Sequence, residues 1–133
     1  MDDLIARLNA AEYGTNDLDA AVLHAMGWTH GVRDYSRGRD GQPYQLDHWI
    51  DADGRMWTGT HYPSSPYALT SKIDDALKAV PSGFTRAVDA TAPECGVDVT
   101  LYGEAGYETV GTHKLEPLAT VIAAMKARAA GYR

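Results

Sequence analysis

The sequence contains a single cysteine, Cys95, among its 133 residues. One thiol cannot form an intrachain disulfide, which fits a reducing compartment, and we expect a cytoplasmic protein. Basic residues are also scarce, since 12 Lys and Arg stand against 18 Asp and Glu and give a formal net charge of −6. A general nucleic-acid binder needs a basic face that displaces counterions, so this balance argues against that class.

The sequence also lacks any apolar run long enough to span a bilayer, so no membrane partner is expected. Asp2 and Asp3 stand near the N-terminus where a signal peptide would carry basic residues, which argues against such a peptide. There is no internal repeat and no low-complexity tract. A chain of 133 residues is therefore predicted to form one domain, residues 1–133.

A capped helix is predicted in the middle of the chain. Ser71 can cap its N-terminus, and Asp74 and Asp75 place negative charge in the first turn, where the helix dipole favours it. Pro81 cannot continue the helix, so the helix is expected to end there. One apolar face is formed at spacings of three and four residues by Ile73, Ala76, Leu77 and Val80.

Two helices are predicted before this one and a further helix after it. The first spans Asp2–Tyr13, and the second is capped by Asn16 or Asp17 and ends at Gly27. The last has Pro117 in its first turn, where a missing N–H costs nothing. Each helix offers a single apolar face, so the helices are expected to cover the sheet rather than lie inside it. In the last helix that face is Leu118, Val121, Ile122 and Met125.

A first hairpin is predicted around the sequence Asp51–Gly54, because Asp and Gly tolerate the dihedral angles of a tight reversal. Its strands are Tyr44–Ile50 and Arg55–Thr60. Trp49 and Trp57 flank the turn, so they are expected to meet across the hairpin.

A second hairpin is predicted to join Val97–Tyr102 to Tyr107–Thr112, after a strand at 84–90. Trp28–Gly41, with three glycines and three arginines, is predicted to be a mobile loop. The order helix, helix, hairpin, helix, three strands, helix indicates an α+β fold. We expect an antiparallel sheet of about four to five strands layered with amphipathic helices, an α-β-α sandwich.

Three segments resemble the phage ABA-sandwich domain, a family of small bacteriophage and prophage proteins: DDLIARLNAAEYGTNDLDAAV, PYALTSKIDDALKAVPSGF and LEPLATVIAAMKARAAG. The central match consists of Tyr67, Thr70, Ser71, Ile73, Asp74, Ala76, Leu77, Val80, Pro81 and Gly83. The chain departs from the family at residues 29–60, which are longer and more aromatic than expected. The resemblance implies an α–β–α layering and a phage origin, and it implies no activity and no catalytic residue.

Aromatic and arginine residues gather in the segment 28–67, which contains all three tryptophans. Guanidinium groups bind phosphates bidentately and aromatic rings stack on bases, but the same residue types dominate protein interfaces. The alternative is that the tryptophans are core residues and the arginines are solvated. The residues predicted to bind a ligand or partner are Trp28, Arg33, Tyr35, Arg37, Arg39, Trp49 and Trp57.

Signals for catalysis, cofactors and metals are weak. Cys95 follows the acidic Glu94, which blunts a thiol, and Ser64 lacks a G-x-S-x-G elbow. There is no Walker loop and no G-x-G-x-x-G. No catalytic residue, cofactor or metal is therefore predicted. Four side chains could converge on the first hairpin, but without the spacing of a metal motif: His48, Asp51, Asp53 and His61.

These observations favour a non-enzymatic binding protein with a host or phage protein as partner, such as a counter-defence inhibitor of a host system. The alternative is a sponge that sequesters a nucleotide immune signal through Arg33, Arg37 and Arg39 around Trp28 or Tyr35. A small hydrolase is a distant third hypothesis. An exposed hairpin edge offers unpaired N–H and C=O groups, so a homodimer by strand addition is a further hypothesis.

Overall fold

The computed structural model describes residues 1–35, 44–59, 63–90 and 96–133. These ranges contain four α-helices and two three-stranded antiparallel sheets, which confirms the α+β class. In chain order the elements are α1 Asp2–Ala10, α2 Asn16–Ala25, β1 Thr29–Tyr35, β2 Tyr44–Ile50, β3 Met56–Thr58, α3 Ile73–Ala76, β4 Thr85–Asp89, β5 Val97–Tyr102, β6 Glu108–His113 and α4 Glu116–Ala129. No helix in these ranges has the length and apolar character that a membrane crossing requires.

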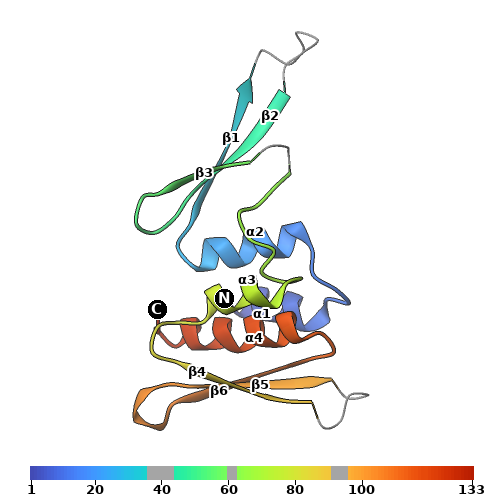
Figure 1. The fold of residues 1–133 in the computed structure, drawn as a ribbon, viewed down its shortest axis with the longest axis vertical. Coiled ribbons are helices and arrows are strands. Elements are labelled where there is room, and N and C mark those ends of the chain that lie inside the picture. Colours follow the sequence, from blue (N-terminus) through green and yellow to red (C-terminus); the bar gives the residue numbers. More distant parts are fainter. Residues whose placement is uncertain (36–43, 60–62, 91–95) are drawn as a thin grey trace.

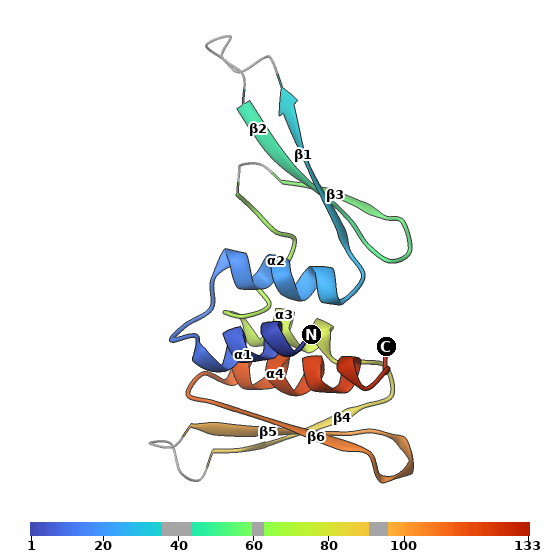
Figure 2. The same cartoon turned by 180° about the vertical axis from the view of Figure 1, so that it is seen from behind.

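The strands form two separate sheets instead of the single sheet of about four to five strands that the sequence predicted. One sheet has the order β1-β2-β3 and the other β4-β5-β6. Figures 1 and 2 show the two sheets at opposite ends of the molecule with the helices between them. Because the helices separate the two sheets, no strand of one reaches a strand of the other.

The segment predicted as a loop, Trp28–Gly41, contains a strand instead. Thr29–Tyr35 forms β1, which runs antiparallel to β2 from the pair Thr29↔Ile50 to the pair Tyr35↔Tyr44. A long partner strand supplies hydrogen bonds that make an extended conformation stable despite the glycine and arginine content. The rest of the predicted loop lies outside the described residues.

Helix α4 lies at the centre of the molecule and not on its surface. It packs against β5 and β6 on one side and against α1, α2 and α3 on the other (Figure 1). The predicted apolar face is fully buried, and so are Ala119, Thr120, Ala123 and Ala124 around it. The expectation of a single buried face was therefore wrong for this helix, whose small alanines allow close contact on both sides. Pro117 lies in its first turn, as predicted.

Helix α3, which the sequence predicted in the middle of the chain, is shorter than predicted. It ends at Ala76, and the chain continues as a 3₁₀ turn over Leu77–Ala79. Lys72 stands at its N-cap position in place of Ser71. Asp75 accepts hydrogen bonds from the Ala68 N–H at 2.8 Å and from Lys78 Nζ at 3.0 Å. Burial by itself raises the pKa of Asp75, but these contacts outweigh it and hold the pKa below its usual value. The helix start is thus anchored to the preceding segment. Helix α1 is shorter too, ending at Ala10 where Tyr13 was predicted.

Candidate functional site

The sheet β1-β2-β3 projects away from the helices, and we call it the arm (residues 29–35, 44–50 and 56–58) (Figure 1). The predicted turn, Asp51–Gly54, joins β2 to β3. Asp51 Oδ1 accepts hydrogen bonds from the N–H groups of Asp53 at 2.9 Å and Arg55 at 2.8 Å, and Gly54 has a φ of 88°. The carboxylate of Asp51 is therefore occupied by its own turn.

The arm has an inner face toward the helices and an outer face away from them. Directly opposed residues of antiparallel strands point to the same face, and successive residues alternate. Trp49 and Trp57 are directly opposed, as predicted. By this alternation the inner face carries His30, Val32, Asp47, Trp49 and Trp57. The outer face carries Arg33, Leu46, His48, Ile50 and Met56.

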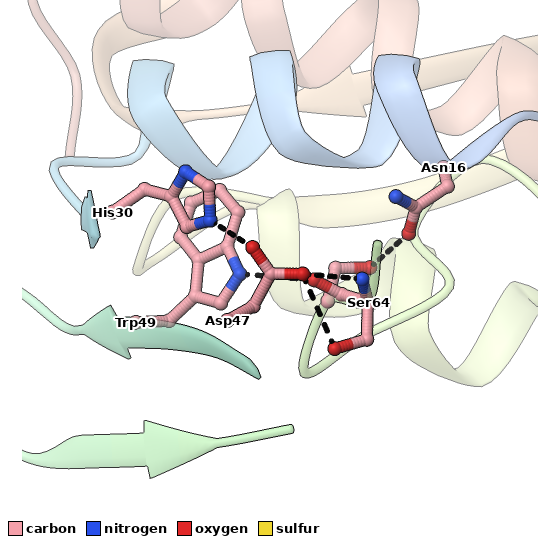
Figure 3. Close-up of polar contacts among 6 residues, drawn as sticks. Asn16, His30, Asp47, Trp49 and Ser64 are labelled. Carbon is pink, nitrogen blue, oxygen red and sulfur yellow. Dashed lines mark hydrogen bonds and ion pairs between the residues drawn. The ribbon is translucent and has the colours of Figure 1, made fainter. Parts of the chain in front are cut away.

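Trp49 is a core residue at the base of the arm. Its side chain is 1% exposed and stacks on His30 with ring centroids 4.3 Å apart. The indole Nε1–H donates to the Ser64 carbonyl at 3.1 Å (Figure 3). The ring centroid of His24 on α2 lies 5.2 Å from that of Trp49. A partner cannot reach this indole unless the arm separates from the helices.

Asp47 is buried beside Trp49 and joins three parts of the chain (Figure 3). Its Oδ1 pairs with Nε2 of His30 on β1. Its Oδ2 accepts a hydrogen bond from the Ser64 N–H at 2.6 Å and a longer one from the Ser64 hydroxyl at 3.4 Å. Aspartate, histidine and serine thus meet, but the hydroxyl contacts the carboxylate where a catalytic triad would direct it to the imidazole. The arrangement links strands β1 and β2 of the arm to the segment that carries Ser64.

The segment that carries Ser64 is tied to the helices as well. The Ser65 hydroxyl donates to Asn16 Oδ1 on α2 at 3.2 Å. Further along, Asp19 Oδ1 accepts from the Thr70 N–H at 2.8 Å and the Thr70 hydroxyl at 2.6 Å. Burial raises the pKa of Asp19, and the two hydrogen bonds from Thr70 offset part of that rise. Helix α2 therefore contacts both the arm and the segment 64–70 that follows it.

The other predicted binding residues are dispersed. Trp28 is half-buried with its ring edge-on to Tyr67, centroids 5.7 Å apart, and Trp57 is half-buried against the core. Arg33 is exposed on the outer face, opposite to the face of Trp49. Tyr35 lies at the end of β1. The structure does not bring Arg33 together with the tryptophans. Arg37 and Arg39 lie outside the described residues.

Within the described ranges, no three His, Cys, Asp or Glu side chains gather as metal ligands. Of the four side chains that could have converged, His61 lies outside those ranges. His48 contacts the Thr58 hydroxyl through Nδ1 at 3.4 Å, and Asp51 is engaged by its turn.

The exposed apolar residues of the arm were missed by the reasoning from sequence. Ile50 and Met56 are directly opposed on the outer face and are 39% and 59% exposed. Val32 of β1 is 43% exposed. The alternation within Tyr44–Ile50 could have assigned Ile50 and Trp49 to opposite faces. It could not have shown which face the helices cover.

Comparison of the chain with protein-family models, with curated proteins and with solved structures finds no match. The resemblance to the ABA-sandwich domain therefore stays a prediction.

Proposed function

We propose that this chain is a non-enzymatic binding protein that contacts another protein through the outer face of the arm. The observation that supports the proposal is the exposed pair Ile50 and Met56, which lies on a sheet that projects from the helices. Paired apolar side chains on a protruding sheet are the type of surface that a protein partner buries. Arg33 on the same face adds a residue type that is enriched in interface hot spots.

The outer face supports a protein partner better than a nucleotide. A nucleotide pocket needs an arginine beside an accessible ring, so that the phosphate and the base are held together. Trp49 is buried, Trp28 packs on Tyr67, and Arg33 points to the other face of the arm from Trp49. The sponge hypothesis would therefore need residues beyond those that the structure describes.

The resemblance to the ABA-sandwich family suggests from which organism the partner protein comes. If the chain is phage-encoded, its partner is a host or phage protein, and we propose a counter-defence inhibitor of a host system. Such an inhibitor acts by occupying a surface, so it needs no catalytic group. The outer face of the arm provides a surface of this kind.

The decisive experiment replaces Met56 by glutamate. Tagged wild-type protein is used to capture a partner from bacterial lysate, and the affinity of the purified pair is then measured by calorimetry. We expect Met56→Glu to weaken binding at least about tenfold, because a charge would have to be buried at the interface. Met56 is 59% exposed, so the fold should be kept, as circular dichroism can verify.

The matched control is Val88→Glu on β4, where a 41% exposed apolar residue lies on the other sheet. An equal loss of affinity in both variants would refute a site on the arm.

A thermal-shift panel of linear and cyclic nucleotides tests the alternative hypothesis of a nucleotide sponge. A ligand present at about a thousand times its dissociation constant adds about 4 kcal/mol of stability. Such a shift, if abolished by Arg33→Ala, would favour the sponge over the protein partner.

A further inference from the structure

Strand β1 forms a free edge of the arm. The strand order β1-β2-β3 leaves it paired on one side only, and the described residues include no strand on its other side. Residues 29–34 are all exposed. At seven residues β1 is longer than β4 or β6. A long edge presents unpaired N–H and C=O groups that can template another strand.

We propose that this edge binds the same edge of a second copy of the chain. The two β1 strands would run antiparallel about a two-fold axis and join the two three-stranded arms into one six-stranded sheet. Opposed residues in an antiparallel pair must point to the same face, so the axis has to pass through a residue and not between two residues. Val32 is the middle residue of Thr29–Tyr35, and centring the axis there pairs the whole strand.

The side chains fit this register. Val32, which is 43% exposed, would face Val32 of the second copy and bury apolar surface that is now in water. His30 would face Asp34 of the second copy, but the His30 imidazole already pairs with Asp47 and Asp34 already accepts from Gln45, so the apolar contact at Val32 carries the register. Arg33 would face Gly31, where added atoms meet nothing within 4 Å. An axis one residue later would place two Arg33 guanidinium groups opposite each other, so the register centred on Val32 is favoured.

The edges of the other sheet fit less well. Strand β4 has five residues, and pairing with itself about Ala87 would place Arg86 opposite Val88, with no charge complementarity. Arg86 is also engaged with Glu116 at 3.2 Å. On β6, Lys126 Nζ donates to the Val110 carbonyl at 2.8 Å, so a side chain already occupies part of that strand. The β1 edge is therefore the one through which the chain would associate.

The dimer would place two outer faces side by side without covering Ile50 or Met56, so it does not depend on the proposed partner. Pairing of two strand edges is expected to form a smaller interface than the roughly 1,200–2,000 Å² of a typical stable complex, so the dimer is expected to be weak and to need a wide concentration range. Sedimentation velocity between about 1 and about 300 µM covers that range. Wild-type protein should shift from monomer to dimer across this series.

Two opposite charges at Val32 provide the sharpest test of the register. Val32→Lys and Val32→Glu should each weaken the homodimer at least about tenfold, because like charges would lie opposite each other at the axis. An equimolar mixture of the two variants should dimerise again. The matched control is Val110→Lys, since Val110 is 40% exposed on the other sheet, and it should behave like wild type.

Hydrogen exchange on the wild-type protein is independent of any variant. Amides of β1 should become more protected as the concentration rises, while those of β4 stay unchanged. Wild-type protein that remains monomeric at the highest concentration would overturn the proposal, and so would a mixture of charge variants that fails to associate. Either result would leave the proposed protein partner of the outer face untouched.

Discussion

Replacing Asp47 by alanine is expected to release the arm from the helices before the rest of the chain unfolds. The Asp47 side chain is 2% exposed and contacts His30 on β1 and Ser64 in the segment after the arm. Alanine removes the acceptor but leaves the N–H of Ser64 in a residue that is 8% exposed. The loss therefore falls on the junction between the arm and α2.

The expected loss of unfolding free energy is the sum of two lost contacts. A buried N–H left without a partner costs about 1–3 kcal/mol. The His30 side chain is 26% exposed, so its pair with Asp47 is partly screened and contributes at most about 1 kcal/mol. The free energy of unfolding should therefore fall by about 2–4 kcal/mol, and amides of β1 and β2 should exchange faster than those of β5.

Urea unfolding gives the free energy, and hydrogen exchange with mass spectrometry locates the loss. Asp98→Ala is the control, because Asp98 is an exposed carboxylate that accepts from the Thr112 hydroxyl at 2.7 Å on the other sheet. It should change stability by less than about 0.5 kcal/mol. A loss below about 1 kcal/mol for Asp47→Ala, or exchange that rises equally in β2 and β5, would refute the role of Asp47 as the anchor of the arm.

Two further predictions concern packing and pH. Gly111→Ala should lower the unfolding free energy by about 1–3 kcal/mol, because its Cβ would lie 2.1 Å from the Ala119 carbonyl oxygen. Thermal unfolding measures both variants. Gly31→Ala, whose added Cβ would meet nothing within 4 Å, should change the unfolding free energy by less than about 1 kcal/mol. Equal losses in the two variants would contradict the close approach of Gly111 to Ala119. Burial raises the pKa of Asp19 above 3.8, so its contribution to stability is complete below that pH and is lost as the pH rises through the raised value. Asp19→Asn keeps an acceptor for Thr70 without the charge. The stability of wild type relative to this variant should therefore fall as the pH rises from below 3.8 through the raised pKa of Asp19, and a constant difference would be inconsistent with a raised pKa.

Local sequence determined the turns and the strands whose neighbours in sequence are their partners. Val97–Tyr102 has the bounds that its alternation predicted, because its partner β6 follows after a short turn. The turn at Asp51–Gly54 forms as expected, since the Asp51 carboxylate caps N–H groups only two and four residues away. These features require only contacts within a few residues, and a pattern in the sequence contains that information.

For the candidate site the sequence predicted a region but not a surface. It predicted binding residues in the segment 28–67, which stays a prediction, and it predicted that Trp49 and Trp57 would meet, which their pairing confirms. It could not tell that Trp49 faces α2 while Ile50, its neighbour, faces solvent. Alternation divides a strand into two faces, but which face becomes buried depends on an element elsewhere in the chain.

Tertiary structure alone decided the division into two sheets and the depth of α4. Strand β1 forms because it is hydrogen-bonded to β2, which lies beyond an intervening segment. The residues of β1 alone do not predict a strand. Helix α4 is enclosed because the β4-β5-β6 sheet and three other helices meet at it, and its alanines are as compatible with a surface as with a core. Burial and strand pairing are properties of two surfaces that come together, and a single stretch of sequence specifies only one of them.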